Sequence, residues 1–295
     1  MPASARPRRS VLYVPGSNAR ALEKARTLPA DGLILDLEDA VAPSAKEEAR
    51  AQVVAALAAG GYGPRERVVR VNGLDTPWGR DDLAAAARSG ADAVCLPKAE
   101  SAAAVLEAER VLAGAGAPPG LALWGMIETP RGVLAAPGIA AATPRLACLV
   151  AGTSDLVKDL RARHTPARAE VLPALGWLLL AARAHGLAAL DGVHLDLADD
   201  AGFEAACRQG RDLGFDGKTL VHPRTIDAAN RAFAPSGEEV ARASRIVAAH
   251  AEAAAAGRGV VVVDGALVEG LHVEEARRVL ALAEAIAARG RGGQG

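Results

Sequence analysis

The 295-residue sequence has few aromatic side chains, few cysteines and no excess of charge of either sign. Aromatic residues make up 3% of the chain, so a core must be mostly aliphatic. The formal net charge of −1, with scattered lysines and arginines, gives no basis for a nucleic-acid-binding surface. Cys95, Cys148 and Cys207 are far apart in the sequence, which argues against a disulfide framework and a site of closely spaced metal-binding thiols.

Long hydrophobic runs are also missing. The basic N-terminus leads into only a short apolar run, Val11–Val14, which is too short for the core of a signal peptide. No segment approaches the roughly 20 apolar residues of a membrane span. We therefore expect a soluble cytoplasmic protein with buried, reduced thiols, and neither nucleic acid nor a membrane among its partners.

Short runs rich in Val, Leu and Ile alternate with longer Ala-rich amphipathic segments, and apolar residues make up 51% of the chain. The runs lack strict polar–apolar alternation, which favours strands covered on both faces. The predicted strands are Ser10–Val14, Gly32–Leu37, Arg67–Val71, Ala93–Pro97, Leu121–Ile127, Leu146–Val150, Ala188–Val193 and Gly217–Val221. Eight strands separated by helices predict a (β/α)8 TIM barrel. An open doubly wound sheet is the alternative, weakened because no Gly-x-Gly-x-x-Gly motif opens a helix after a strand.

The pattern changes after the eighth predicted strand. Residues 237–255 and 273–288 are typical of helices, and residues 259–269 of two short strands around an Asp-Gly turn. We expect residues 1–230 to form the barrel. Residues 231–295 should form a C-terminal helical and hairpin extension that lies over its own barrel or over a neighbour's.

One acid follows each of the fifth and sixth predicted strands, Glu128 and Asp155. Because neighbouring parallel strands end at one edge, the two carboxylates can reach a single hard cation. Alternatively, each acid caps the helix after its strand. With no His or Cys nearby, Mg2+ or Mn2+ is favoured over Zn2+. His194 and His222 have no evident partner at ligand spacing, and we interpret both as structural.

The second, third and fourth predicted strands also end in charged residues. Asp36, Glu38 and Asp39 repel one another unless a cation or donors compensate them. They indicate an outer shell around metal-bound water or a lysine, or else a helix cap with solvated neighbours. Arg70 lies in an apolar strand and needs a partner, either substrate oxygens or a strand-two acid. For Lys98 a salt bridge to Glu38 or Asp36 is favoured over a Schiff base.

Taken in order along the chain, these motifs resemble the citrate lyase beta-subunit-like group of the HpcH/HpaI aldolase superfamily, which includes malyl-CoA and citramalyl-CoA lyases. The resemblance runs from the first strand to the final helix. The motifs that carry it are Arg9–Gly16, Asp36–Val41, Arg70–Asn72, Leu96–Lys98, Ile127–Pro130, Gly152–Leu156, and Gly217-Lys218 with His222-Pro223.

The resemblance implies a barrel in which Glu128 and Asp155 bind Mg2+, with Mn2+ as an alternative. It implies catalytic roles for Arg70, which contacts the substrate's oxygens, and for Glu38 and Asp39, which lie around the metal's waters. These roles are implied by the resemblance to the family.

The resemblance also implies an acyl-thioester substrate whose CoA or carrier arm crosses the barrel mouth. Pro15, Gly16 and Lys98 are expected to bind this substrate together with Arg70. Similar members are trimers or hexamers in which the C-terminal segment covers a neighbour's site, so a homotrimer or homohexamer is expected. Members with lyase activity carry an acid/base Asp in a Gly-x-Met-Ile-Asp motif of that segment. Here the corresponding stretch ends in Glu269, a carboxylate one methylene longer.

The leading hypothesis is therefore an Mg-dependent carbon–carbon lyase. It would cleave a 3-hydroxyacyl-CoA such as malyl-, citramalyl- or citryl-CoA to a 2-oxo acid and acetyl-CoA. Two alternatives stay open: hydrolysis of the malyl-CoA thioester, and a non-catalytic metabolite-binding homologue. Free CoA with intact malate would indicate hydrolysis, whereas glyoxylate would indicate cleavage.

Overall fold

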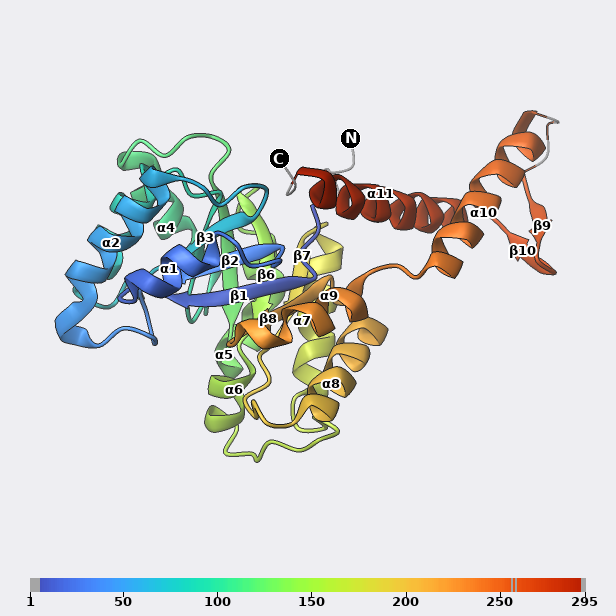
Figure 1. Cartoon of the computed structure of the whole chain (residues 1–295). Coiled ribbons are helices and arrows are strands. Elements are labelled where there is room, and N and C mark those ends of the chain that lie inside the picture. Colours follow the sequence, from blue (N-terminus) through green and yellow to red (C-terminus); the bar gives the residue numbers. More distant parts are fainter. Residues whose placement is uncertain (1–5, 256, 258, 293–295) are drawn as a thin grey trace. The chain divides into compact units, whose positions relative to one another are not determined.

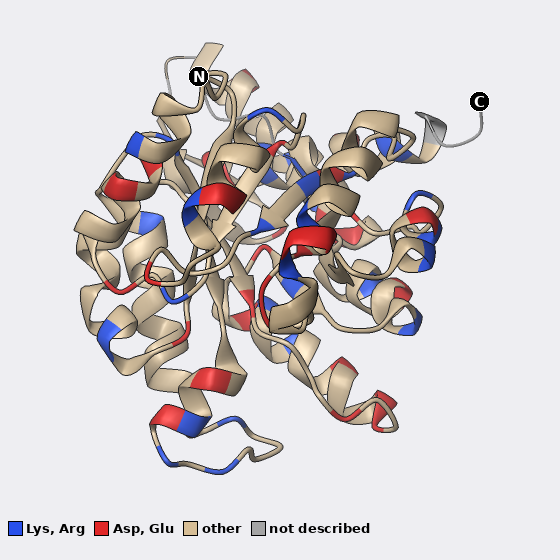
Figure 2. Cartoon of the chain, turned by 90° about the vertical axis from the view of Figure 1, so that its left-hand side faces the viewer, with Lys and Arg blue, Asp and Glu red and all other residues tan. Residues whose placement is uncertain are grey.

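The chain divides into two compact units, a large one over Arg8–Phe233 and a small one that contains the residues after 233 (Figure 1). The computed structural model describes residues 6–255, 257 and 259–292. Acidic and basic residues are interspersed over the ribbon rather than gathered in a block of one sign (Figure 2).

The large unit is a closed barrel of eight parallel strands, which confirms the predicted fold. Strand β1 pairs with both β2 and β8, and this closes the sheet. The strands are β1 (Ser10–Pro15), β2 (Gly32–Asp36), β3 (Glu66–Arg70), β4 (Ala93–Leu96), β5 (Ala122–Ile127), β6 (Leu146–Ala151), β7 (Ala188–Asp191) and β8 (Gly217–Leu220). Every predicted strand forms, with ends shifted by one or two residues.

Helices cover the outside of the barrel and follow its strands in turn (Figure 1). They are α1 (Ala19–Ala25), η1 (Pro43–Ala45), α2 (Lys46–Ala59), α3 (Gly79–Ala87), α4 (Ala102–Gly114), α5 (Pro130–Ala140), α6 (Thr153–Asp159), α7 (Leu172–Ala184), α8 (Asp200–Leu213), η2 (Pro223–Thr225) and α9 (Ile226–Phe233).

The strands bury both of their faces, which explains why the sequence lacks strict alternation. On β2, Ile34 belongs to the cluster that fills the barrel, whereas Leu33 and Leu35 belong to the larger cluster shared with the helices. Trp124 and Met126 on β5 fill the interior and are almost completely buried. Trp124 is therefore a packing residue, as the sequence indicated.

A buried ion cluster joins β7 and β8 to the loop before α7, and sequence reasoning missed it. The carboxylate of Asp191 accepts a hydrogen bond of 2.8 Å from Lys218 Nζ and one of 2.9 Å from Arg168 Nη1. Asp191 and Lys218 are completely buried. Burial alone would raise the pKa of Asp191, but the two cations outweigh it and lower that pKa. The cluster is structural, because it lies outside the barrel lumen, beside Gly210 of α8.

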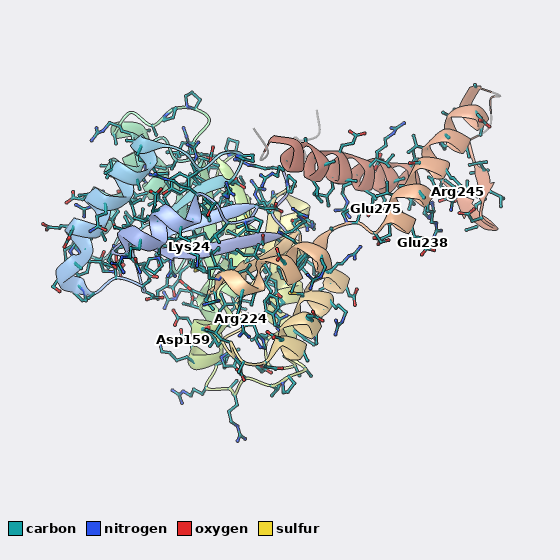
Figure 3. All side chains as sticks on the ribbon, in the orientation of Figure 1. Lys24, Asp159, Arg224, Glu238, Arg245 and Glu275 are labelled. Atoms are coloured by element: carbon teal, nitrogen blue, oxygen red, sulfur yellow. The ribbon has the colours of Figure 1, made fainter. Side chains whose placement is uncertain are left out.

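The small unit consists of α10 (Gly237–Ala255), the hairpin β9 (Val261–Val263) and β10 (Ala266–Val268), and α11 (Gly270–Gly292). Asp264 and Gly265 have φ values of 51° and 77°, as a tight two-residue hairpin turn requires. Arg245 on α10 lies 2.7 Å from the Asp264 carboxylate and ties the helix to the turn (Figure 3). The predicted helical and hairpin extension is thus present.

Among the described residues, no helix is both long enough and apolar enough to cross a bilayer.

We expect Lys218→Met to lower the free energy of unfolding by about 3–5 kcal/mol, because Asp191 would stay buried with one of its two cations removed. The comparison is Arg80→Met, which breaks an exposed pair with Glu107 (2.8 Å) and should change stability by less than about 1 kcal/mol. Urea denaturation of both variants provides the measurement. Equal stabilities would show that the buried cluster contributes nothing.

Candidate active site

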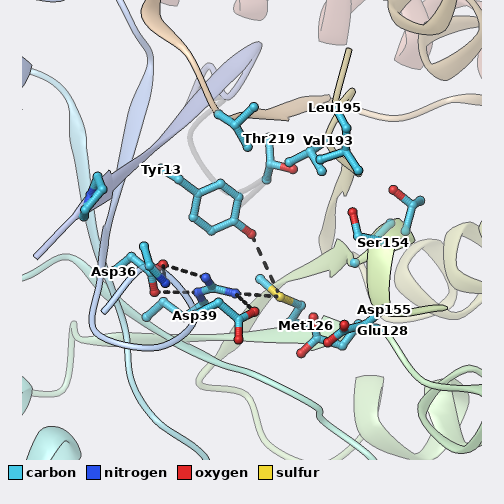
Figure 4. A pocket seen from close by; sticks show the side chains of 17 residues that line it. Tyr13, Asp36, Asp39, Met126, Glu128, Ser154, Asp155, Val193, Leu195 and Thr219 are labelled. Carbon is cyan, nitrogen blue, oxygen red and sulfur yellow. Dashed lines mark hydrogen bonds and ion pairs between the residues drawn. The ribbon is translucent and has the colours of Figure 1, made fainter. Parts of the chain in front are cut away.

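A cavity of about 400 Å3 lies at the carboxyl ends of the barrel strands, where barrel enzymes place their active sites (Figure 4). Strands β1, β2, β3, β5, β6 and β8, or the segments that follow them, contribute to its wall, as does the segment after β7. The residues that line it include Tyr13, Pro15, Asp36, Asp39, Arg70, Met126, Glu128, Ser154, Asp155, Val193, Leu195, Thr219 and Val221.

Arg70 is held by acids of the second strand. Its Nε and Nη2 donate to Asp36 Oδ1 and Oδ2 at 2.7 and 2.6 Å, and its Nη1 lies 2.8 Å from Glu38 Oε2 and 3.6 Å from Asp39. Burial alone would lower its pKa, but the Asp36 pair raises the pKa well above the ordinary value. Its guanidinium also lies over the ring of Tyr13, 4.9 Å from the centroid. The structural ion pair is therefore present, and the predicted substrate contact stays a prediction.

The loop after β2 wraps around Asp36. The backbone N–H groups of Glu38 and Ala40 donate to its carboxylate at 2.9 and 3.2 Å. Lys46 at the start of α2 supports the loop from below, since its buried Nζ donates to the carbonyls of Leu37 and Glu38 at 2.9 and 2.7 Å. This loop presents Glu38 to Arg70. The sequence offered no signal for Lys46, because its partners are backbone oxygens.

Glu128 and Asp155 line the same cavity and lie next to each other in Figure 4. Glu128 directly follows β5 and is 4% exposed, and Asp155 lies in the first turn of α6. Thr129, not Glu128, caps α5, because the Thr129 hydroxyl accepts the Gly132 N–H at 3.0 Å. The capping alternative is therefore wrong for Glu128, which leaves its carboxylate for the cavity.

The surroundings of Glu128 hold its carboxylate in a tight cradle. A Cβ on Gly152 would lie 2.3 Å from Glu128 Cβ and 2.7 Å from its Oε2, so only glycine leaves room for this side chain. Oε1 accepts the Lys98 N–H at 2.7 Å. Burial raises the pKa of Glu128 to about 7, with a contribution from Glu38, against the lowering effect of the Lys98 N–H.

Lys98 connects three acids at the rim. Its Nζ lies 3.2 Å from Glu38 Oε1 and 3.7 Å from Asp155 Oδ2, while its backbone N–H binds Glu128. The favoured salt bridge to Glu38 is confirmed. Its φ of 44° is in the left-handed region that non-glycine residues rarely adopt, and such strain often accompanies a functional position.

The donor set fits a magnesium ion. No group of three or more His, Cys, Asp or Glu side chains within the described ranges is arranged to hold a metal. Mg2+ does not need one, because it keeps several waters and takes only one or two carboxylates from the protein. Glu128 and Asp155 supply that number, and oxygen-only donors do not suit zinc.

The remaining predicted residues have separate places. Pro15 lines the cavity, whereas Gly16 packs against the loop after β2, where a Cβ would lie 2.7 Å from the Asp36 carbonyl oxygen. Glu269 belongs to the small unit, where it is exposed just before α11 and its N–H donates to His272 Nδ1 at 3.0 Å. The larger unit alone provides the lining of the cavity.

Both histidines make local contacts. His194 meets the ring of Phe203 edge-on at 6.0 Å, and His222 Nδ1 accepts the Arg224 N–H at 3.2 Å. These contacts agree with the structural interpretation of both side chains.

Sequence reasoning missed several cavity residues, including Tyr13, Ser154, Val193 and Leu195. The Ser154 Oγ is inaccessible and has no hydrogen-bond partner among the described atoms. Charged residues at strand ends stand out in the sequence, whereas the apolar and hydroxyl-bearing side chains of a cavity wall do not. For Tyr13, the alternation of β1 places its side chain on the same face as Val11, which faces the barrel interior.

The sequence matches known proteins over most of its length. Residues 9–223 match the family model described as HpcH/HpaI aldolase/citrate lyase. The (3S)-malyl-CoA thioesterase of Cereibacter sphaeroides is 54% identical, covering 96% of this chain and 97% of that protein. The citrate lyase subunit beta of Escherichia coli is 43% identical, with 95% and 94% covered.

A solved relative has the same fold. The structure of CitE from Mycobacterium tuberculosis in complex with magnesium, acetoacetate and coenzyme A is 32% identical in sequence, with a TM-score of 0.74. The match covers 95% of this chain and 99% of that one. The resemblance noted in the sequence is confirmed, and the protein belongs to the HpcH/HpaI aldolase/citrate lyase family.

Proposed function

We propose that the protein is an Mg2+-dependent enzyme that cleaves the carbon–carbon bond of a 3-hydroxyacyl-CoA such as malyl-CoA, to give a 2-oxo acid and acetyl-CoA. The observation that carries the proposal is the presence of Glu128, Asp155 and Arg70 in one cavity at the barrel mouth. The magnesium and coenzyme A bound by the related CitE support the choice of metal and of thioester.

Each residue has a role in this reaction. Glu128 and Asp155 would hold Mg2+, which acts as a Lewis acid toward substrate oxygens when bound. Arg70, fixed by Asp36, would stabilise the negative charge on the hydroxyl oxygen as that oxygen gives its proton to solvent water and becomes a carbonyl. The carbon–carbon bond then breaks, and its electron pair passes to the acetyl carbon, which takes a proton from Glu269.

Thioester hydrolysis is the second candidate, and a specific observation favours it. The relatives at 54% identity are named (3S)-malyl-CoA thioesterase, whereas those at 43% are named citrate lyase subunit beta. Hydrolysis would use the same binding groups, but water would attack the thioester carbon and release CoA and malate. A non-catalytic metabolite-binding protein is the least favoured alternative, because the cavity brings together Arg70, Glu128 and Asp155.

We further infer that residues 231–295 cover the active site of a neighbouring subunit in a homotrimer or homohexamer. The hairpin and the start of α11 expose Val262, Leu267 and Leu271 by 64%, 56% and 63%. Exposed apolar side chains of this kind suit burial against another subunit. Such an arrangement would let Glu269 act in a neighbour's cavity.

We assign the protein to the cytoplasm. The three cysteines are buried and free, a state that a reducing compartment maintains.

Incubation with malyl-CoA and Mg2+ should yield glyoxylate and acetyl-CoA. Glu128→Gln and Asp155→Asn should each weaken Mg2+ binding by more than the roughly 10–100-fold that outer-shell changes cost, and remove turnover. Calorimetric titration with Mg2+ and product identification are the measurements. Glu100→Gln, at an acid outside the cavity that pairs with Thr129, is the control and should bind Mg2+ normally. Malate with free CoA as the products would select hydrolysis instead, and normal Mg2+ binding in both acid variants would refute the site.

Gly152→Ala should weaken Mg2+ binding by about 10-fold or more, because the new methyl group must displace the Glu128 side chain. The matched control is Gly138→Ala on α5, where an added Cβ meets nothing within 4 Å. Titration with Mg2+, with circular dichroism to check folding, tests the prediction. Equal Mg2+ affinities in the two variants would contradict the role of the cradle.

Glu269→Gln should lower kcat by roughly 10²–10⁴-fold, the usual contribution of a positioned general acid, and leave Mg2+ affinity unchanged. Glu274→Gln, an exposed acid of α11, is the control. Mixing Glu269→Gln subunits with Arg70→Met subunits should restore part of the activity, because mixed oligomers would contain complete sites. No recovery on mixing, despite subunit exchange, would place Glu269 outside a shared site.

A further inference from the structure

We propose that the hydroxyl of Tyr13 donates a hydrogen bond to the same substrate oxygen that Arg70 stabilises, which makes Tyr13 a further catalytic residue at the barrel mouth. The inference rests on the proposed function and deepens it, because it assigns a neutral donor to the oxygen that becomes the carbonyl of the 2-oxo acid. Two donors that meet at one weak acceptor carry this assignment.

Tyr13, Arg70 and Met126 belong to alternate strands of the barrel, β1, β3 and β5. Barrels of this kind fill their interior with layers of side chains to which alternate strands contribute. Met126 is part of the cluster that fills the barrel, and Tyr13 packs against that cluster. All three residues also line the cavity. They therefore meet where the packed interior of the barrel opens into the cavity.

The sulfur of Met126 is the point at which two donors converge. The Tyr13 hydroxyl donates to Met126 Sδ at 3.9 Å, and Arg70 Nη1 donates to the same sulfur at 3.9 Å (Figure 4). A thioether sulfur is a weak acceptor. A buried tyrosine hydroxyl usually finds a stronger one, yet among the described residues this sulfur is the acceptor that Tyr13 has. The cavity thus holds donors that its own walls satisfy poorly.

A substrate oxygen can take the place of that weak acceptor. Arg70 uses Nε and Nη2 for Asp36, so Nη1 is the nitrogen turned toward the sulfur. Nη1 carries two N–H groups, which lets it pair with Glu38 at 2.8 Å and still donate a second hydrogen bond. Methionine side chains are flexible, so an oxygen that enters from the cavity beside Met126 can accept from both donors.

The proposed cleavage gives this oxygen a negative charge. The substrate hydroxyl passes its proton to solvent water, the carbon–carbon bond breaks, and the electron pair of that bond goes to the acetyl carbon. Tyr13 keeps its own proton, because burial raises the pKa of its hydroxyl well above the ordinary value, against the lowering effect of Arg70. A hydrogen bond to a charged oxygen is stronger than one to a neutral carbonyl. Tyr13 therefore stabilises the transition state more than the bound product.

Tyr13→Phe removes the hydroxyl and keeps the ring, which lies 4.9 Å from the Arg70 guanidinium. Calorimetry with Mg2+ present should show an affinity for pyruvate, the 2-oxo acid of a citramalyl thioester, that is about 3–10-fold lower. The kcat for cleavage should fall further, by about 10–100-fold, because the acceptor is then charged. Mg2+ affinity should stay unchanged. A folded Tyr13→Phe protein with the wild-type affinity for pyruvate would overturn the proposal.

Tyr62→Phe is the matched control. The Tyr62 hydroxyl donates to the Leu22 carbonyl oxygen at 3.3 Å, and Tyr62 is not among the residues that line the cavity. This variant loses the same atom from a buried tyrosine, so its affinity for pyruvate and its kcat should match those of the wild type. Circular dichroism of both variants checks that they fold.

A spectroscopic measurement on the wild-type protein tests the contact directly. The chain has two tyrosines, so 13C labelling of tyrosine at the ring carbon that bears the hydroxyl gives two NMR signals. Pyruvate with Mg2+ should shift the Tyr13 signal and leave the Tyr62 signal in place. Tyr62→Phe identifies both signals by elimination, even if Tyr13→Phe does not fold. A Tyr13 signal that stays in place at saturating pyruvate would refute the hydrogen bond.

Failure of this inference is distinguishable from failure of the proposed function. Lack of turnover of malyl- and citramalyl-CoA would contradict the proposed activity, whereas pyruvate binding and the NMR shift require no chemistry and decide on Tyr13 by themselves. In hydrolysis the substrate hydroxyl keeps its proton. Malate and free CoA as products should therefore go with a Tyr13→Phe variant that binds pyruvate more weakly but keeps a kcat near the wild-type value.

Discussion

The pairing of Arg70 with Asp36 is the interaction on which the rest of the site depends. The two residues are directly opposite each other in the register of β2 and β3, and their side chains form a buried two-pronged pair. Asp36 also anchors the loop that follows it, and that loop brings Glu38 to Arg70. Loss of either partner would leave a buried charge uncompensated, at a cost of about 3–5 kcal/mol.

From this pair a chain of charges crosses the barrel mouth. Glu38 lies between Arg70 and Lys98, and Lys98 reaches Asp155 with its ammonium and Glu128 with its backbone N–H. The carboxylates proposed for the metal are thereby tied to the group proposed for the substrate. Acids outnumber cations there, so a divalent ion would stabilise the site electrostatically. Burial raises the pKa of Glu128, which means that the buried carboxylate is only partly compensated by the groups around it.

The family relationship narrows the range of possible reactions but does not identify a single one. Relatives that share much of this sequence bear the names of a thioesterase and of a lyase subunit, so one scaffold serves different outcomes.

Local patterns in the sequence predicted the barrel and many of the residues at its rim. Unbroken apolar runs indicated strands buried on both faces, and parallel strands place their final residues at one mouth, so Arg70, Lys98, Glu128 and Asp155 were identifiable as candidates. The pairing of Lys98 with Glu38 followed from the need to compensate clustered acids. The sequence could not tell whether Glu128 caps a helix, because the answer depends on Thr129 taking that role.

Only the folded chain determines the contacts between residues that are distant in the sequence. Lys46 binds carbonyl oxygens, Asp191 binds two cations from other elements, and Val193 lines one cavity with Glu128 only because the barrel closes. Periodicity and charge are local properties, and they determined the elements and the residues at their ends. Distances across the mouth are set by packing and strand register, so the tertiary structure alone decided which of these residues share a cavity and which apolar side chains join them.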